Sequence, residues 1–307
     1  MEGPSLDVTI IIPVRDREDE LRLCLEGVQA NDYPGMEILV VDDGSCDSSA
    51  AVAEARGCRV IRLRQPRGPA HARNRGAQEA RGEVLIFLDS DVVIPPDAVA
   101  RALQALSAEE KVCGVSAVYT AATRARGFFS RYLNIKQHFY QVSLPEASGT
   151  VYSSFFAVKR DCFHGCGGFD VAVDGAAADD IVLGRRLQAE GCRLVFSRAL
   201  KVEHLKVVSP LGFLRYNFHH AREWYKATQS HSEMLSEKVA ISRRNLINTL
   251  LVFLLSLALP AAVAARLLAW DSSLSYSPAL LIFAALAVWN LPYLSYIARR
   301  LGWLFAF

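Results

Sequence analysis

The sequence predicts an α/β protein in which a doubly wound sheet is followed by an interfacial helical segment and two C-terminal transmembrane helices. Three observations predict this architecture. Strand-like and helix-like patterns alternate four times in the first ninety residues, as they do in βαβ units. Two of these strands end in aspartates, and the last part of the chain contains two uncharged stretches of twenty residues each.

Apolar runs mark the expected strands, and amphipathic stretches between them mark the helices. Strands are expected at 8–12, 38–41, 59–63, 84–88, 112–119, 152–158 and 193–196. Helices are expected after Asp16, which should cap the first of them, after residue 45, from Gly68 to Gly82, at 96–106 and at 179–191. The apolar run 84–88 lies between Gly82 and Pro95, which is typical of a strand buried on both faces in the middle of a parallel sheet.

Acidic side chains follow two of these strands. Asp42 and Asp43 follow the second strand, and Asp89 and Asp91 follow the run 84–88. Ligands of open α/β sheets bind at this carboxyl edge, so the two acidic pairs should lie near each other. Two neighbouring carboxylates repel unless a cation lies between them, and a divalent ion carrying a diphosphate fits that position. The alternative is a set of solvated turn and cap residues.

The second half of the chain changes in character. Residues 120–149 are basic and aromatic, which fits a helix over the cleft or an ordinary amphipathic helix on the sheet. Residues 210–245 mix tryptophan and tyrosine with cations, as segments at a membrane surface do. The uncharged stretches 246–265 and 279–298 are long enough to span a bilayer, and their basic flanks place both ends of the hairpin in the cytoplasm. The expected organisation is therefore a catalytic domain at 1–209, an interfacial segment at 210–245 and a transmembrane hairpin at 246–307.

Composition excludes several classes of protein. A net charge of +2 indicates no nucleic-acid partner. Seven cysteines without a CxxC pair favour reduced thiols over a disulfide framework or a zinc site. The first residues lack the basic and apolar regions of a signal peptide. No Gly-x-Gly-x-x-Gly follows the first strand, which argues against a dinucleotide-dependent oxidoreductase.

Seven short motifs occur in a characteristic order along residues 6–206. They are Ile-Ile-Pro-Val at 11–14, Val-Asp-Asp-Gly-Ser at 41–45, Gly-Pro-Ala-His-Ala-Arg-Asn-Arg-Gly-Ala at 68–77, Leu-Asp-Ser-Asp at 88–91, Gly-Gly-Phe-Asp at 167–170, Asp-Asp-Ile-Val-Leu-Gly-Arg-Arg-Leu at 179–187 and Val-Glu-His at 202–204. In this order they resemble the family 2 glycosyltransferases. The resemblance implies a GT-A fold, which is a Rossmann-like mixed sheet, and inverting transfer from a nucleotide-diphosphate sugar. The donor is expected to be a UDP-sugar.

The resemblance also implies roles for individual residues. Residues implied to bind the nucleotide sugar are Pro13, Val14, Arg15, Asp42, Asp43, Arg73, Asp89, Ser90 and Asp179. Within this set Asp43 would hydrogen-bond the base, Arg73 would reach the nucleotide and Asp89 would contact the ribose. Asp91 and His204 would bind Mn²⁺ or Mg²⁺, and an imidazole ligand favours Mn²⁺. Asp180 would act as the general base that deprotonates the acceptor.

The sequence also departs from common patterns of the family. Val14-Arg15-Asp16 replaces the usual aromatic and Asn after the first proline, and Asp179 stands where Glu usually precedes the base. A Gln-x-x-Arg-Trp motif is absent, which argues against a processive polymer synthase. A base at Asp180 favours a hydroxyl acceptor on a lipid or lipid-linked saccharide. The alternatives are a polyprenyl-phosphate glycosyl synthase, whose acceptor needs no base, and a non-catalytic nucleotide-binding membrane protein.

Overall fold

The structure is a computed structural model of the chain. It describes residues 7–146, 151–172, 178–213, 215–219 and 222, together with scattered positions between 282 and 299. The chain forms two compact units, Met1–Ser230 and His231–Phe307. Among the residues that the structure describes, no helix combines the length and the apolar character needed to cross a bilayer. The predicted spans 246–265 and 279–298 lie outside those residues apart from the scattered positions, and so does most of the predicted interfacial segment.

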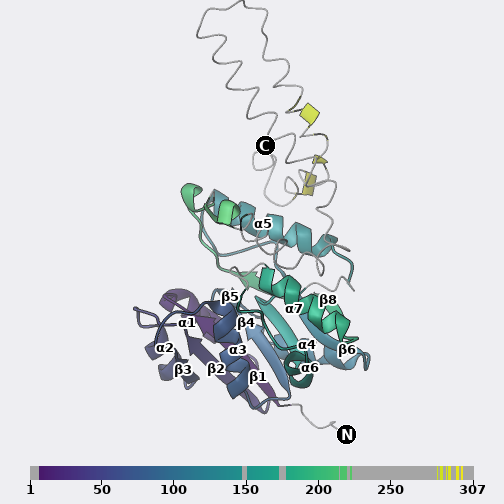
Figure 1. Cartoon of the computed structure of the whole chain (residues 1–307). Helices are drawn as coiled ribbons and strands as arrows, with labels where there is room; N and C mark the ends of the chain where they lie inside the picture. The colour runs from purple at the N-terminus through teal and green to yellow at the C-terminus, as the bar shows by residue number, and fades with distance from the viewer. Residues whose placement is uncertain are drawn as a thin grey trace, which may run out of the picture. The chain divides into compact units, whose positions relative to one another are not determined.

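A mixed sheet with helices on both faces forms the described part of the first unit (Figure 1). Its strands are β1 Val8–Val14, β2 Met36–Asp42, β3 Arg59–Arg62, β4 Val84–Leu88, β5 Val92–Val93, β6 Val112–Tyr119, β7 Phe155–Lys159 and β8 Arg193–His204. The helices are α1 Glu18–Gln29, α2 Ser49–Ala55, α3 Pro69–Glu79, α4 Ala98–Ser107, α5 Phe128–Ser143, α6 Arg160–Gly165 and α7 Ala178–Ala189. The strands lie in the order β3-β2-β1-β4-β7-β6-β8-β5. The predicted alternation of strands and helices is confirmed.

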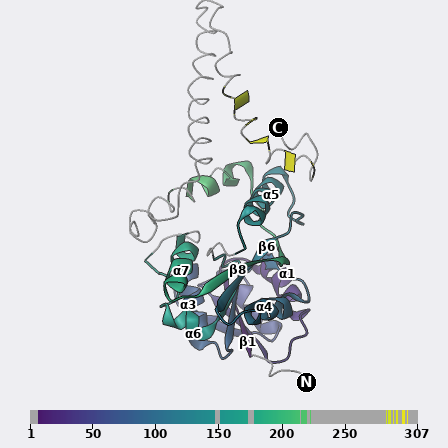
Figure 2. The same cartoon turned by 90° about the vertical axis from the view of Figure 1, so that its right-hand side faces the viewer.

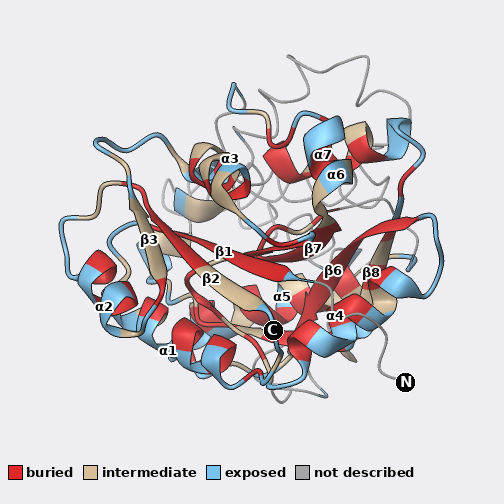
Figure 3. Cartoon of the chain, turned by 90° about the horizontal axis from the view of Figure 1, so that it is seen from below, coloured by how far each residue is buried: buried red, intermediate tan, exposed pale blue. Residues whose placement is uncertain are grey.

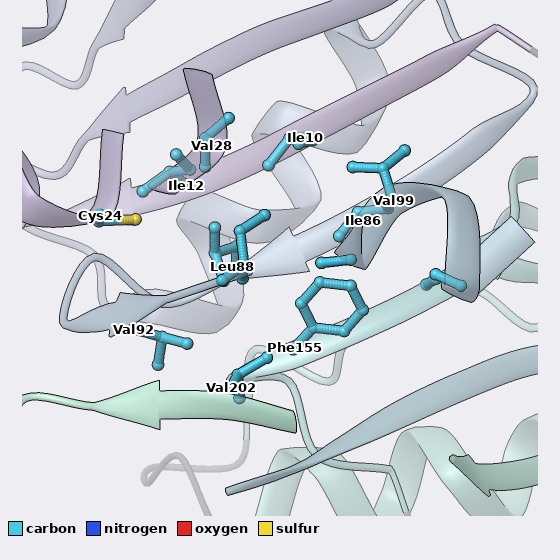
Figure 4. Packing of buried hydrophobic residues seen from close by; sticks show 14 of the residues in the cluster. Ile10, Ile12, Cys24, Val28, Ile86, Leu88, Val92, Val99, Phe155 and Val202 are labelled. Atoms are coloured by element: carbon cyan, nitrogen blue, oxygen red, sulfur yellow. The ribbon is translucent and has the colours of Figure 1, made fainter. Parts of the chain in front are cut away.

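Two apolar layers cover the sheet, because successive residues of a strand point to opposite faces. On one face, Ile10 and Ile12 of β1 and Ile86 and Leu88 of β4 pack against α1 and α4 (Figure 4). On the other face, Ile11 of β1 and apolar residues of the neighbouring strands pack against α3, α6 and α7. Figure 3 shows α1, α2 and α4 on one side of the sheet and α3, α6 and α7 on the other. The sheet is therefore doubly wound, as predicted.

The central strand β4 lies where the sheet changes direction. All five of its residues are buried, which confirms the prediction of burial on both faces. β4 runs parallel to β1 but antiparallel to β7. The prediction that β4 lies in the middle of a parallel sheet is therefore wrong on the side of β7. The physical reason is the order of pairing along the chain: β7 inserts between β4 and β6 and runs antiparallel to both. The acids that follow β4 thus lie where the parallel part of the sheet meets its antiparallel part.

Two local predictions need correction. Asp16 does not cap α1, which begins two residues later after Arg17. Instead Asp16 adopts a left-handed conformation with φ of 51°, and its carboxylate accepts the backbone N–H of Cys46 at 2.7 Å. The strand expected at 193–196 continues as β8 to His204, with an irregularity in its pairing with β6. The alternation of buried and exposed residues along β8 is interrupted at Arg198 and Ala199, and only the apolar stretch before this interruption was recognised as a strand from the sequence.

Helix α5 lies beyond the carboxyl edge of the sheet in both side views (Figure 1 and Figure 2). Its buried face includes polar side chains at helical spacing, namely Ser130, Asn134, His138 and Gln141. Asn134 donates its amide to the carbonyls of Thr120 and Ala121, which follow β6. The helix predicted within residues 120–149 therefore exists, and it fastens the end of β6 with hydrogen bonds as well as apolar packing.

Candidate active site

The carboxyl edge of the sheet brings together Asp91 and His204, which are far apart in the sequence. β5 follows Asp91 directly and pairs antiparallel with the end of β8, so that Val92 lies opposite His204. The backbone N–H of Leu205 also donates to the carbonyl of Asp91 at 2.8 Å. In this register Nε2 of His204 lies 3.5 Å from Oδ2 of Asp91, and both residues are buried. Two predicted metal ligands therefore meet at one point.

A hydrogen bond from His204 and the charges of nearby cations act on the carboxylate of Asp91. Burial alone would raise the pKa of Asp91, but His204, Lys206 and Arg17 together hold it well below its usual range. Arg17 precedes α1 and Lys206 follows β8, so the two cations reach the site from different parts of the fold. The ionised carboxylate is thus the stable form of Asp91 at neutral pH, which is the form that a metal ion needs.

Tyr119, the last residue of β6, fixes the ring of His204. The two rings stack with 4.7 Å between their centroids and an angle of 6° between their planes. α5 in turn holds the backbone of Tyr119, because the side-chain oxygen of Gln141 accepts its N–H at 2.7 Å and His138 hydrogen-bonds to its carbonyl. The hydroxyl of Thr123 donates to the carbonyl of His204 at 2.7 Å. These contacts preorganise the imidazole beside Asp91.

Arg73 of α3 links the end of β4 to the start of α7. Its side chain is only 2% exposed, and its Nη2 lies 2.7 Å from Oδ1 of Asp89 while Nη1 lies 3.4 Å from Oδ2 of Asp179. The guanidinium also lies over the ring of Phe169. Burial lowers the pKa of Arg73, but the charges of Asp89, Asp179 and Asp180 raise it above its ordinary value. Arg73 therefore positions two carboxylates of the edge, and its contact with a nucleotide stays a prediction.

Replacing Arg73 by methionine should lower the free energy of unfolding by about 3–5 kcal/mol, because two carboxylates lose a buried counter-ion while the side-chain volume is kept. Chemical denaturation of the purified chain measures this loss. Arg75→Met is the matched control, since Arg75 lies on the same helix in a half-exposed pair with Glu79, and its replacement should cost less than about 1 kcal/mol. Equal losses in the two variants would show that the buried pairs of Arg73 do not stabilise the fold.

Asp180 lies at the start of α7, on a different element from the pair Asp91–His204. Its Oδ2 accepts the backbone N–H of Ser153 at 3.0 Å. Its Oδ1 is buried and has no hydrogen-bond partner among the described residues. Burial, followed by the charge of Asp179, raises the pKa of Asp180 well above its usual range, although Arg73 and Ser153 oppose the shift. A carboxylate with a raised pKa and an unused oxygen is a strong proton acceptor.

The loops after β2 and β3 are held by the first acidic pair. The two carboxylate oxygens of Asp43 accept the backbone N–H groups of Arg67 and Gly68, both at 2.8 Å. Asp42 accepts the N–H of Ser45 at 2.9 Å. Asp42 thus supports the loop that follows β2. Asp43 also supports a loop, and its contact with a nucleobase stays a prediction.

The remaining predicted residues lie at the same edge. Pro13 and Val14 are buried at the end of β1, whereas the next residue, Arg15, is exposed. Ser90 is buried between the two acids that follow β4. The predicted site residues therefore lie at or just after the carboxyl ends of β1, β2, β4 and β8, or on the helices α3 and α7, which pack on one face of the sheet. Pairing of β5 with β8 accounts for the part of this arrangement that crosses the sheet.

Sequence reasoning missed four residues that shape the site. Arg17 and Lys206 supply positive charge beside Asp91, Tyr119 stacks on His204, and the backbone of Ser153 binds Asp180. Lys206 closely follows the Val-Glu-His motif, so its nearness to His204 was a signal in the sequence. The other three lie next to a partner only because the strands fold into one sheet, and the sequence pattern alone carries no sign of those contacts.

Solved structures define the class of fold. The mannosyltransferase PcManGT from Pyrobaculum calidifontis, solved in complex with GDP-Man and Mn²⁺, matches with a TM-score of 0.69 and 21% identity over 98% of this chain and 86% of that one. S. aureus TarS 1-349 in complex with UDP-GlcNAc matches with a TM-score of 0.52 and 17% identity, covering 81% of each chain. The fold is therefore the GT-A-like mixed α/β sheet of glycosyltransferases.

The sequence places the chain within that class. Residues 9–166 match the family described as Glycosyl transferase family 2, and this match covers about half of the chain. The chain belongs to glycosyl transferase family 2. It is also 35% identical over 112 residues to the succinoglycan biosynthesis protein ExoO of Rhizobium meliloti, a similarity that covers 34% of this chain and 32% of that protein. The chain spans less than half the length of the curated relatives that it matches.

Proposed function

We propose that this chain is an inverting, metal-dependent glycosyltransferase. It transfers a sugar from a nucleotide-diphosphate sugar to a hydroxyl of a lipid or lipid-linked saccharide at the cytoplasmic face of the cell membrane. The observation that carries the proposal is that the candidate metal ligands and the candidate base lie on different elements of the fold. Asp91 directly precedes β5 and His204 ends β8, whereas the buried carboxylate of Asp180 lies on α7. One direct displacement needs a donor site and a proton acceptor on opposite sides of the sugar.

The donor set of Asp91 and His204 fits a divalent ion. A carboxylate oxygen and an imidazole nitrogen 3.5 Å apart can ligate one ion after a small approach of the two side chains. An imidazole ligand favours Mn²⁺ over Mg²⁺. The complex of the similar mannosyltransferase with Mn²⁺ supports this assignment. When bound, such an ion offsets the charge that develops on the leaving nucleoside diphosphate.

Cations of the chain itself complement this charge. Arg17 and Lys206 help to lower the pKa of Asp91 through their charges, and we propose that the same two cations attract phosphate oxygens bound next to it. Asp89, held by Arg73 and still about one third exposed, is proposed to accept hydrogen bonds from a ribose. The donor is proposed to be a UDP-sugar. The complex of TarS with UDP-GlcNAc supports this nucleotide, whereas the complex of the mannosyltransferase with GDP-Man makes GDP the main competitor.

Asp180 is proposed to remove the proton of the acceptor hydroxyl as it attacks the anomeric carbon. Its unpartnered Oδ1 is the oxygen free to accept that proton. The backbone N–H of Ser153 holds the other oxygen and so fixes the carboxylate plane. A phosphate acceptor is already ionised and needs no base, so a buried carboxylate with a raised pKa favours a hydroxyl acceptor.

Exposed apolar side chains support a membrane location for the acceptor. Phe128 and Tyr140 of α5, and Leu211 and Phe218 beyond β8, are large hydrophobic residues exposed to solvent. The two segments belong together, since the ring of Phe213 packs against α5. We call α5 and the segment after β8 that packs against it the α5 platform. Large exposed apolar groups on such a platform are typical of a lipid-facing surface. With the predicted spans 246–265 and 279–298, this platform supports a multi-pass membrane protein whose catalytic domain faces the cytoplasm.

Nucleotide binding tests the proposal first. The detergent-purified chain is heated with UDP, GDP, dTDP, CDP or NAD, each with and without Mn²⁺. A ligand at about a hundred times its dissociation constant should add roughly 2.7 kcal/mol of stability. We expect one nucleoside diphosphate, UDP first, to stabilise the chain only when Mn²⁺ is present. No stabilisation by any of them would favour a non-catalytic membrane protein that has lost the donor site.

A further inference from the structure

Three cysteines from separate parts of the chain meet in space. They are Cys113 near the start of β6, Cys162 on α6, and Cys192 in the turn between α7 and β8. Their Sγ atoms all lie within 4.8 Å of one another. Cys113 and Cys192 are buried and Cys162 is partly buried. All seven cysteines of the chain are free thiols, and no CxxC spacing in the sequence announces this cluster.

The cluster lies at the amino edge of the sheet, away from the donor site. β6 and β8 both begin there, and the antiparallel β7 ends there and leads into α6. The backbone is fixed around the thiols, because the N–H of Cys192 donates to the carbonyl of Leu187 at 3.0 Å and the N–H of Arg193 donates to the carbonyl of Lys111 at 2.9 Å. Three thiols are thus held by three elements whose positions are set independently.

The spacing of the sulfurs suits a soft metal ion. A tetrahedral Zn²⁺ site with Zn–S bonds of about 2.3 Å places its sulfurs about 3.8 Å apart. The observed limit of 4.8 Å is within reach of that value through small side-chain rotations. Soft thiolates select Zn²⁺ and related d¹⁰ ions over Mg²⁺ and Mn²⁺, so such a site does not compete with Asp91 and His204 for the same metal.

Burial is the largest cause that raises the pKa of Cys162 and of Cys192. Binding of a metal ion by thiolates releases the protons of the ligating thiols. The resulting unit of one divalent ion and three thiolates has a single negative charge. Lys159 is the cation that acts electrostatically on Cys162, and it partly offsets that charge.

We propose that Cys113, Cys162 and Cys192 bind one thiophilic d¹⁰ cation, Zn²⁺ in the simplest case, through three thiolates and leave a fourth position for solvent. No electron transfer is involved, and the protons go to the solvent. The bound ion ties α6 and the end of α7 to β6. Because α7 carries Asp179 and Asp180 at its other end, the ion also steadies the helix that presents them.

Titration with Cd²⁺ tests the proposal directly. The full chain is purified in detergent, reduced, freed of metal by a chelator and titrated with Cd²⁺ while sulfur-to-metal charge-transfer absorption is followed. We expect one Cd²⁺ per chain, displacement by Zn²⁺, and a rise in thermal stability with either ion. Cd²⁺ bound at Asp91 and His204 gives no sulfur absorption, so the signal separates the two sites.

Two serine variants provide the matched comparison. Cys162→Ser removes a proposed ligand, and it should weaken Cd²⁺ binding by at least about a hundredfold, the upper range for loss of an outer-shell partner alone. Cys166→Ser, one turn further along at the end of α6, should bind as wild type does, because its sulfur contacts the carbonyl of Phe163 instead of the cluster. Cys192→Ala serves as the second ligand variant should Cys162→Ser fail to fold.

Three outcomes would overturn the proposal. One is wild-type protein without a charge-transfer signal. Another is equal Cd²⁺ binding by Cys162→Ser and wild type, which would point to the exposed thiol of Cys46. The third is a thiol titration that finds five free thiols and no metal in unreduced protein, since two cluster cysteines would then form a disulfide.

Discussion

Replacing Asp180 by asparagine should abolish transfer to a hydroxyl acceptor while nucleotide binding remains. Loss of a positioned general base costs about 10²–10⁴-fold in rate. The asparagine keeps an oxygen for the N–H of Ser153, so the geometry of the site is preserved. Radiolabelled sugar transfer from the donor identified by thermal stabilisation measures the rate, and the stabilisation itself measures nucleotide binding.

The same substitution should stabilise the fold at neutral pH. Asp180 has a raised pKa in the folded chain, so its contribution to stability is fully present below the pKa of the unfolded chain and is lost as pH rises through the folded pKa. At neutral pH the raised pKa of Asp180 costs the wild type stability, because burial disfavours the ionised form that the unfolded chain carries, whereas the variant has no such group. The unfolding temperature of Asp180→Asn should therefore exceed that of the wild type at pH 7, and the difference should shrink in acid.

Glu190→Gln is the matched control for Asp180→Asn. Glu190 is an exposed acid just beyond the other end of α7, and its neutralisation should change neither the rate nor the pH dependence of stability appreciably. If Asp180→Asn glycosylates a polyprenyl phosphate at the wild-type rate, Asp180 is not the base, and the polyprenyl-phosphate synthase becomes the better description. Transfer to a hydroxyl at the wild-type rate would contradict the proposed mechanism outright.

Local patterns predicted most of the fold because each element carries its own signal. The apolar run of β4, the helical stripe of α1 and the glycine that opens α3 are all readable within a few residues. The direction in which a strand runs within the sheet has no such local signal. Burial of β4 on both faces is compatible with a parallel or an antiparallel neighbour, so the pairing of β4 with β7 could not be derived from its apolar run.

The site was predictable in its residue types and less so in its contacts. The acids at the ends of β2 and β4 could be recognised as candidate ligands from the sequence, because parallel strands of a doubly wound sheet end at a common edge. The meeting of Asp91 with His204 depends on the two-residue strand β5, which is too short to produce a periodic pattern. The pairs of Arg73 with Asp89 and Asp179, and the cluster of three cysteines, likewise depend on long-range packing.

Replacing Asp91 by asparagine should have the opposite effect on stability and an equally severe effect on activity. Transfer should fall by about 10²–10³-fold or more, the order lost when one preorganised electrostatic group is removed. Stabilisation of the chain by nucleotide should no longer depend on Mn²⁺. Asp97→Asn is the control. Asp97 lies six residues after Asp91 and is an exposed partner of Arg101, so its replacement should leave both properties unchanged. Full activity of Asp91→Asn with Mn²⁺ would remove Asp91 from the metal site.

The sign of the stability change distinguishes the two aspartates. His204, Lys206 and Arg17 depress the pKa of Asp91 in the folded chain, so its stabilising contribution is present above the pKa of the unfolded chain and is lost as pH falls through the folded pKa. In chelator-treated protein at pH 7, Asp91→Asn should therefore melt below the wild type and Asp180→Asn above it. Both substitutions remove one negative charge from the same edge of the sheet, so a change in net charge alone would shift both melting temperatures in the same direction. Opposite shifts would show that the surroundings of Asp91 favour its ionised form, as a metal ligand requires, while burial disfavours the ionised form of Asp180, as expected for a buried general base.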